Sequence, residues 1–147
     1  MFDEKVCYPL NIEELKIPLE SGNYIICLKN GVKLPSHNEL QDPVYTTFKG
    51  FDVLYTGIAS NLFKRIIGNH IVGLGKSTFR VSLGVFISNS NDRTKWILEN
   101  LIFFYCQNEN AEEIEKIIIN KYNPPFNLKH NTNPINQEFR RELGVKR

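Results

Sequence analysis

The stretch of sequence that decides the fold runs from residue 51 to residue 67 and reads FDVLYTGIASNLFKRII. Its first part, Phe51 to Gly57, is mostly aromatic, β-branched or aliphatic and predicts a strand. Ser60 or Asn61 can then cap a helix, because apolar residues recur behind them at helical spacing. We therefore expect a strand that leads directly into a helix at the centre of the fold.

Two further strands are predicted, one on each side of this stretch. The run from Tyr24 to Lys29 is β-branched and aromatic, and turn-forming Gly22 and Gly31 lie just outside it. The run from Leu101 to Cys106 is aromatic and apolar, and it is too continuous for an exposed edge strand. Residues 30–50 contain glycines and prolines that predict a long insertion between the first two strands rather than a tight hairpin.

Helices are predicted in the segments around the third strand. Residues 77–87 alternate like a strand, but Ser77 can cap a helix that buries Phe79 and Leu83, and we favour the helix. A short helix is expected over residues 93–98, behind a polar loop.

Two more helices are predicted after the third strand. The pattern Asn110-Ala111-Glu112-Glu113 is typical of a capping box, and the helix that it opens should run to about Tyr122. Residues 134–147 predict one further short helix. The whole pattern indicates an α+β fold, a small three-stranded antiparallel sheet flanked by helices. The 147 residues are suited to one domain, residues 1–147.

Composition limits the class of protein. No apolar run approaches the roughly 20 residues needed to cross a bilayer, and the acidic N-terminus lacks the pattern of a signal peptide. We therefore expect a soluble, cytoplasmic protein with no membrane partner. Cys7, Cys27 and Cys106 are widely separated and have no zinc-ligand spacing, so we expect buried, reduced thiols.

Positive charge is concentrated in one part of the chain, although the net charge is only +2. Residues 60–98 contain a single acid, Asp92, and the bases Lys64, Arg65, Lys76, Arg80, Arg93 and Lys95. Such a segment can follow a phosphate backbone, but charge alone favours an ordinary solvated surface.

Five features, in this order, resemble the GIY-YIG nuclease domain. They are Gly22-Asn23-Tyr24, Tyr55-Thr56-Gly57, Arg65, Glu115 and, after Pro124-Pro125, Asn127. The resemblance covers about residues 22–128, with the insertion at about 30–50, and leaves residues 129–147 as a basic tail. It implies a metal-dependent DNA endonuclease with a small antiparallel sheet.

The chain departs from that family pattern at three points. Asn23 and Thr56 stand where isoleucine is usual, and we expect them only to pack. The two motif tyrosines are 31 residues apart, which resembles the variant with an insertion between the strands. His70 follows Arg65 by five positions, where four is commoner.

The resemblance implies a role for each site residue. The planar guanidinium of Arg65 suits a clamp on the scissile phosphate. Glu115 is the expected ligand of one Mg²⁺ or Mn²⁺, whose remaining ligands would be water and phosphate oxygens. Tyr24 is expected to activate water, with assistance because a free phenol has a pKa of about 10. Tyr55 would orient water or phosphate.

The remaining residues have supporting roles. Asn127 is expected to fix the active-site turn by hydrogen bonds. His70 is a candidate catalytic residue, or else a structural histidine. Lys64, Lys76 and Arg80 are the predicted contacts to the DNA backbone. Gly-Lys-Ser at residues 75–77 resembles the end of a nucleotide-binding loop, but His70 stands where that motif needs its first glycine.

Other interpretations stay open at the level of sequence. A catalytically idle module that binds nucleic acid or protein could use the same scaffold. Among nucleases, no appended DNA-reading motif separates a restriction-like or mobile-element enzyme from a structure-selective repair enzyme. The oligomeric state is not predicted.

Overall fold

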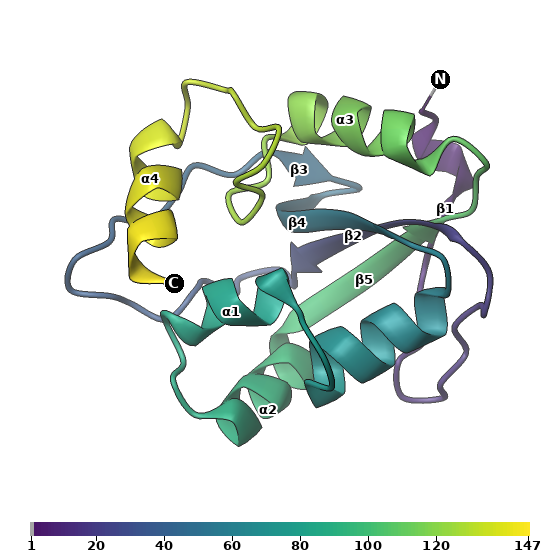
Figure 1. Ribbon diagram of the computed structural model, residues 1–147, viewed down its shortest axis with the longest axis horizontal. Helices are drawn as coiled ribbons and strands as arrows, with labels where there is room; N and C mark the ends of the chain where they lie inside the picture. Colours follow the sequence, from purple (N-terminus) through teal and green to yellow (C-terminus); the bar gives the residue numbers. More distant parts are fainter. Residues whose placement is uncertain (1) are drawn as a thin grey trace.

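A five-stranded antiparallel sheet forms the centre of the computed structural model, which describes residues 2–147 (Figure 1). The strand order is β1-β5-β2-β4-β3. The strands are β1 (Cys7–Pro9), β2 (Gly22–Leu28), β3 (Thr47–Phe48), β4 (Phe51–Ala59) and β5 (Leu101–Cys106). The α+β class is confirmed, but the prediction of three strands was wrong. The predicted strands are β2, β4 and β5, and the two missed edge strands are too short to show a period in the sequence.

The helices largely follow the predicted pattern. They are η1 (Glu4–Val6), a 3₁₀ turn; η2 (Lys64–Val72), a π-helix; and the α-helices α1 (Thr78–Gly84), α2 (Ser90–Asn100), α3 (Ala111–Tyr122) and α4 (Gln137–Lys146). The helix favoured for residues 77–87 is confirmed as α1, and α2 is longer than predicted. The predicted capping box was wrong in detail, because the Asn110 side chain accepts no capping hydrogen bond within the described chain.

Helices cover both faces of the sheet. Helix α3 lies over one face, and η2, α1 and α2 lie over the other (Figure 1). Because side chains alternate along a strand, β2 supplies Ile25 to the core beneath α3, whereas Tyr24 and Ile26 enter the core on the opposite face. The motif tyrosine Tyr24 is thus part of the larger of the two apolar cores.

A β-bulge in β4 sets the face of the sheet to which the Tyr55 side chain points. Ile26 pairs with Tyr55, but the next residue of β2 pairs with Val53, so Leu54 is the extra residue. Leu54 and Tyr55 consequently both join the core on the Tyr24 face. The Leu54 carbonyl accepts a hydrogen bond from Phe126 N at 3.0 Å, which joins the turn after α3 to β4.

The insertion after β2 makes specific contacts with α4. Val44 N donates to Asn136 Oδ1 at 2.8 Å, and Asn136 Nδ2 donates back to the Val44 carbonyl at 2.6 Å. Lys146 Nζ lies 2.6 Å from a Glu39 carboxylate oxygen. The insertion therefore helps to hold the C-terminal helix beside α1.

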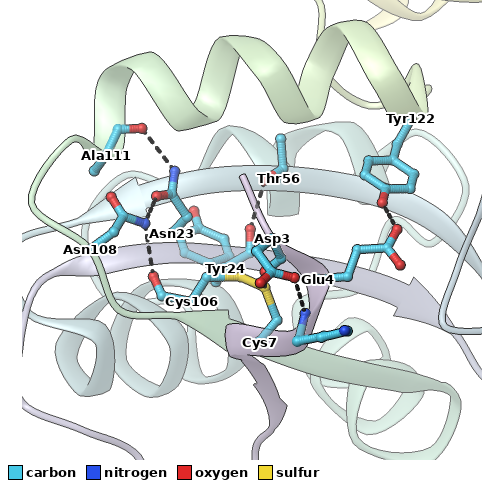
Figure 2. The surroundings of a disulfide bond; sticks show 11 residues. Asp3, Glu4, Cys7, Asn23, Tyr24, Thr56, Cys106, Asn108, Ala111 and Tyr122 are labelled. Atoms are coloured by element: carbon cyan, nitrogen blue, oxygen red, sulfur yellow. Dashed lines mark hydrogen bonds between the residues drawn. A yellow bond between two sulfur atoms is a disulfide. The ribbon is translucent and has the colours of Figure 1, made fainter. Parts of the chain in front are cut away.

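A disulfide joins Cys7 to Cys106, which face each other across β1 and β5 (Figure 2). The expectation that all three cysteines are reduced was therefore wrong, and only Cys27 is a buried free thiol. Disulfides persist in oxidising environments and are rare in the cytosol, and the cytoplasmic location stays a prediction. Among the described residues, no helix is long and apolar enough to span a membrane.

Candidate active site

Both motif glycines are required by close neighbours. Tyr24 pairs with Gly57 across the sheet, and a Cβ at Gly57 would lie 2.2 Å from the Tyr24 hydroxyl oxygen. A Cβ at Gly22 would lie 2.6 Å from the Cys106 carbonyl oxygen. Gly22 lets two strands approach closely, and Gly57 makes room for the phenol ring.

Tyr24 lies in a buried hydrogen-bonded chain. Its hydroxyl is 2.7 Å from His70 Nε2, and His70 Nδ1 is 2.7 Å from Ser77 Oγ. Tyr24 and His70 are both 0% exposed. The Tyr55 ring lies beside both, with centroid distances of 6.3 Å to Tyr24 and 6.1 Å to His70. Tyr24, Tyr55 and His70 were candidate site residues from the sequence, whereas Ser77 was not.

The π-helix accounts for the unusual spacing of Arg65 and His70. In a π-helix the backbone hydrogen bonds span five residues instead of the four of an α-helix. Residues five apart therefore take the place on one face that residues four apart take in an α-helix. Arg65 and His70 are both within η2, so the extra residue between them is absorbed by the wider turn.

The charges around this group are consistent with a neutral His70. Burial lowers the pKa of His70 to about 3, and the positive charges of Arg65 and Arg80 act in the same direction. Burial, followed by the neighbouring Tyr55, raises the pKa of Tyr24 well above its ordinary value. The charge of Arg65 opposes that rise and the charge of Glu115 adds to it, so both charged side chains are close enough to influence the phenol.

A cavity of about 260 Å³ lies in front of Tyr55. Its lining residues come from β4, α1, α3, the turn after α3 and α4, and they include Tyr55, Thr78, Glu115 and Asn127. Glu115 is the only carboxylate side chain among them in the described chain. The half-buried Glu115 has a raised pKa, first because of desolvation, while His130 opposes the rise.

The donor set at Glu115 can be tested against a divalent ion. Among residues 2–147 there is no group of three or more His, Cys, Asp or Glu side chains that could hold a metal. A hard cation such as Mg²⁺ is nevertheless often held by one or two carboxylates, with water and phosphate oxygens completing its coordination. The chemistry of the site therefore fits such an ion at Glu115.

The Asn127 side chain pairs with the backbone of β4 at Thr56. Its Oδ1 accepts from Thr56 N at 2.9 Å and its Nδ2 donates to the Thr56 carbonyl at 2.8 Å, as a neighbouring strand would. These are the kind of hydrogen bonds expected of Asn127, and they place the turn after α3 against the motif strand.

Asn23 and Thr56 do more than pack, contrary to the prediction. Asn23 Nδ2 donates to the Ala111 carbonyl at 2.9 Å, at the start of α3 (Figure 2). Thr56 Oγ1 donates to the Tyr24 carbonyl at 2.8 Å. The two polar substitutions in the motifs thus tie β2 to α3 and to β4 through buried hydrogen bonds.

The DNA-binding residues predicted from sequence lie in different environments. Lys64 and Lys76 are exposed, on η2 and on the loop after it. Arg80 is only 5% exposed, and its guanidinium donates to the carbonyls of His70, Ile71 and Ser90 and to the hydroxyls of Ser90 and Thr94. These bonds engage both Nη1 and Nη2 in holding the helices together, and the DNA contact of Arg80 stays a prediction.

Arg65 is not among the residues that line this cavity. Both of its hydrogen bonds use Nη1, one to the Lys76 carbonyl at 2.9 Å and one to Asn69 Oδ1 at 3.3 Å. The structure therefore brings Tyr55, Glu115 and Asn127 together in one cavity. Tyr24 and His70 lie behind Tyr55, and Arg65 is outside the lining of the cavity.

Several site residues gave no usable signal in the sequence. The cavity is also lined by Thr78, whose hydroxyl is 3.1 Å from the Tyr55 hydroxyl, and by the bases Lys129, His130 and Arg147. The only indication in the sequence that Lys129 and His130 belong to the site was that they follow the Pro-Pro-Phe-Asn turn closely. Arg147 reaches the site because α4 folds back, with its Nη1 donating to Ser82 Oγ at 3.1 Å.

A comparison with protein-family models matches residues 22–147 to the GIY-YIG catalytic domain. These residues are most of the chain, so the match points to a nuclease domain. The chain belongs to the GIY-YIG family. The match includes residues 129–147, which the sequence resemblance had left outside the core. No curated protein and no solved structure matches the chain.

Proposed function

We propose that the chain is a divalent-metal-dependent endonuclease that hydrolyses DNA phosphodiester bonds. The observation that carries the proposal is the single cavity shared by Tyr55, Glu115 and Asn127, with the Tyr24–His70 pair directly behind it. Nuclease activity in general follows from the family. The metal, the DNA substrate and the roles of individual residues are our inference.

Glu115 is the proposed ligand for Mg²⁺ or Mn²⁺. The ion would supply positive charge against the phosphate oxygens in the transition state. The basic lining residues Lys129, His130 and Arg147 complement a polyanion, because the cavity would otherwise present the charge of Glu115 alone. Exposed Lys64 and Lys76 are the proposed contacts to flanking phosphates.

Arg65 is the proposed clamp on the scissile phosphate. Its Nη1 is held by the Lys76 carbonyl and Asn69, which leaves Nε and Nη2 to donate to two phosphate oxygens. Its charge also influences both Tyr24 and His70.

Tyr24 is proposed to accept a proton from the attacking water while its own proton passes to His70 Nε2. A concerted transfer avoids a free phenolate, which burial strongly disfavours here. Burial and, after it, the positive charges of Arg65 and Arg80 keep His70 neutral, and the negative phosphate beside Arg65 would offset the contribution of the charges. Tyr55, at the cavity surface, would orient water or phosphate. When DNA binds, one water must reach the Tyr24 hydroxyl.

The test is cleavage of supercoiled plasmid with Mg²⁺, with Mn²⁺ and with EDTA. We expect nicking that needs a divalent ion and that is strongly reduced in Arg65→Ala and Glu115→Gln. Failure of the wild type to nick, or full activity in both variants, would contradict the proposal. Metal-independent DNA binding without cleavage would favour the idle binding module instead.

The preferred DNA can be found in the same experiment. A restriction-like or mobile-element enzyme should cut particular sequences in linear duplex, whereas a structure-selective enzyme should prefer branched substrates to random duplex of equal length.

A further inference from the structure

The hydrogen-bonded chain behind the cavity continues beyond His70. Ser77 Oγ lies 2.7 Å from His70 Nδ1 and accepts a hydrogen bond from Arg80 N at 3.0 Å. Ser77 therefore caps α1 and contacts the imidazole with the same oxygen atom. No role in the proposed reaction follows from its capping of the helix alone.

The loop before Ser77 is fixed against η2 at several points. Asn69 Nδ2 donates to the Leu74 carbonyl at 2.7 Å, and Arg65 Nη1 donates to the Lys76 carbonyl. Gly73 and Gly75 have positive φ angles of 91° and 66°, which glycine adopts without strain. The Gly-Lys-Ser sequence that resembles a nucleotide-binding loop thus forms a tight turn that presents Ser77 to His70.

Two tautomers of His70 are compatible with these distances. In the first, Nδ1–H donates to Ser77 and Nε2 accepts from the Tyr24 hydroxyl. In the second, Ser77 donates to Nδ1 and Nε2–H donates to Tyr24. Each arrangement leaves one hydroxyl hydrogen without an acceptor in the described chain, that of Ser77 in the first and that of Tyr24 in the second.

Burial decides between the tautomers. Without DNA, Tyr24 is 0% exposed, so its hydroxyl hydrogen has no water to bond, and an unpaired buried donor is costly. Ser77 is 5% exposed and lines a pocket at the surface with Lys76 and Thr78, so its hydroxyl hydrogen is closer to solvent than that of Tyr24. The first tautomer is therefore the stable one.

We infer that Ser77 is a positioning residue for the proposed cleavage: it accepts the Nδ1–H bond of His70 and so leaves Nε2 as the acceptor for the Tyr24 proton. This inference rests on the proposed function. When water gives a proton to Tyr24 and Tyr24 gives its own to Nε2, His70 becomes an imidazolium. The imidazolium then donates through Nδ1 to Ser77 and through Nε2 to Tyr24, so both of its N–H groups stay paired.

The first measurement is the ¹⁵N NMR spectrum of the His70 side chain in the wild-type protein. The chain has three histidines, and His37→Gln with His130→Gln would isolate the His70 signals. We expect a protonated Nδ1 and a bare Nε2. This readout needs no cleavage, and a protonated Nε2 with a bare Nδ1 would overturn the inference.

The second measurement uses variants matched for helix capping. Glycine is nearly as good an N-cap as serine, so Ser77→Gly removes the acceptor for His70 at a cost of only a few tenths of a kcal/mol. Ser77→Thr keeps the hydroxyl. We expect kcat for plasmid nicking to fall on the order of 100-fold in Ser77→Gly with little change in KM, and to recover in Ser77→Thr.

The outcomes separate this inference from the proposed function. An inactive wild type would overturn both. An active wild type whose kcat is unchanged in Ser77→Gly would overturn the role of Ser77 alone. Should Ser77→Gly fail to fold, the wild-type spectrum still decides.

Discussion

At the residue scale, Gly57 shows how the motif is determined by packing. Its partner across the sheet, Tyr24, has its hydroxyl where a side chain at position 57 would start. We expect Gly57→Ala to lower the free energy of unfolding by at least about 2 kcal/mol, because strand backbone and a buried ring must both move. Thermal or urea unfolding measures the loss.

Gly68→Ala is the matched control, since nothing lies within 4 Å of its added Cβ and alanine favours a helix. That variant should be at least as stable as the wild type. Equal stability of the Gly57→Ala protein would show that the phenol is not held against the strand.

A second residue-scale prediction concerns His70 and pH. Because its pKa is about 3 in the folded protein and about 6.5 in an unfolded chain, only the unfolded chain takes up this proton between these values. Stability from this group is complete above pH 6.5 and falls by about 1.4 kcal/mol per pH unit below it.

The stability difference between wild type and His70→Gln should therefore change by about 2 kcal/mol in favour of the variant between pH 6.5 and pH 5. Urea unfolding of both proteins at each pH cancels the contribution of shared carboxylates. A difference that stays constant over this range would mean that His70 is readily protonated in the folded protein.

At the element scale, Arg80 holds three helices together. Its guanidinium bridges carbonyls of η2 and groups of α2 from a position in α1. Arg80→Gln should lower the free energy of unfolding by about 3 kcal/mol, because buried carbonyls lose charged donors.

Exposed Lys76→Gln is the control for that substitution, with an expected change within about 0.5 kcal/mol. DNA affinity of the folded Arg80→Gln protein tests the predicted DNA contact separately. Reduced affinity without reduced stability would support Arg80 as a DNA contact, and affinity equal to that of the wild type would contradict it.

The elements that sequence predicted best are those with long, regular patterns. Strands β2, β4 and β5 and helix α3 carry continuous apolar runs or a clear period, so their existence and type were recognisable. The bulge at Leu54 and the π-helix were not, because each depends on one extra residue in an otherwise ordinary pattern.

The site was predictable only as far as its motifs. Tyr55, Glu115 and Asn127 share a cavity because three elements far apart in sequence meet there, and the order of motifs indicated that meeting. Ser77 was recognisable as a helix cap, but its contact with His70 depends on the loop conformation. Cys7 and Cys106 were misjudged because their pairing depends on the register of a three-residue strand.

At the scale of the whole molecule, the disulfide joins strand β1 to strand β5 across 99 residues of sequence. Closing so long a loop restricts the unfolded chain, so reduction should lower the free energy of unfolding by about 4 kcal/mol. Urea unfolding with and without dithiothreitol measures this change.

Cys27→Ala should respond to dithiothreitol as the wild type does, whereas Cys7→Ala should not respond. Thiol titration of the denatured, unreduced wild type should detect only Cys27. Titration of all three thiols would show that the bond does not form.

The nicking rate of supercoiled plasmid in Mg²⁺ tests the central claim most directly, when wild type, Glu115→Gln and Glu113→Gln are compared. Both glutamates lie on α3, but only Glu115 lines the cavity with Tyr55. We predict that Glu113→Gln nicks as the wild type does and that Glu115→Gln is slower by on the order of 100-fold or more. An inactive wild type, or equal rates for all three proteins, would contradict the account.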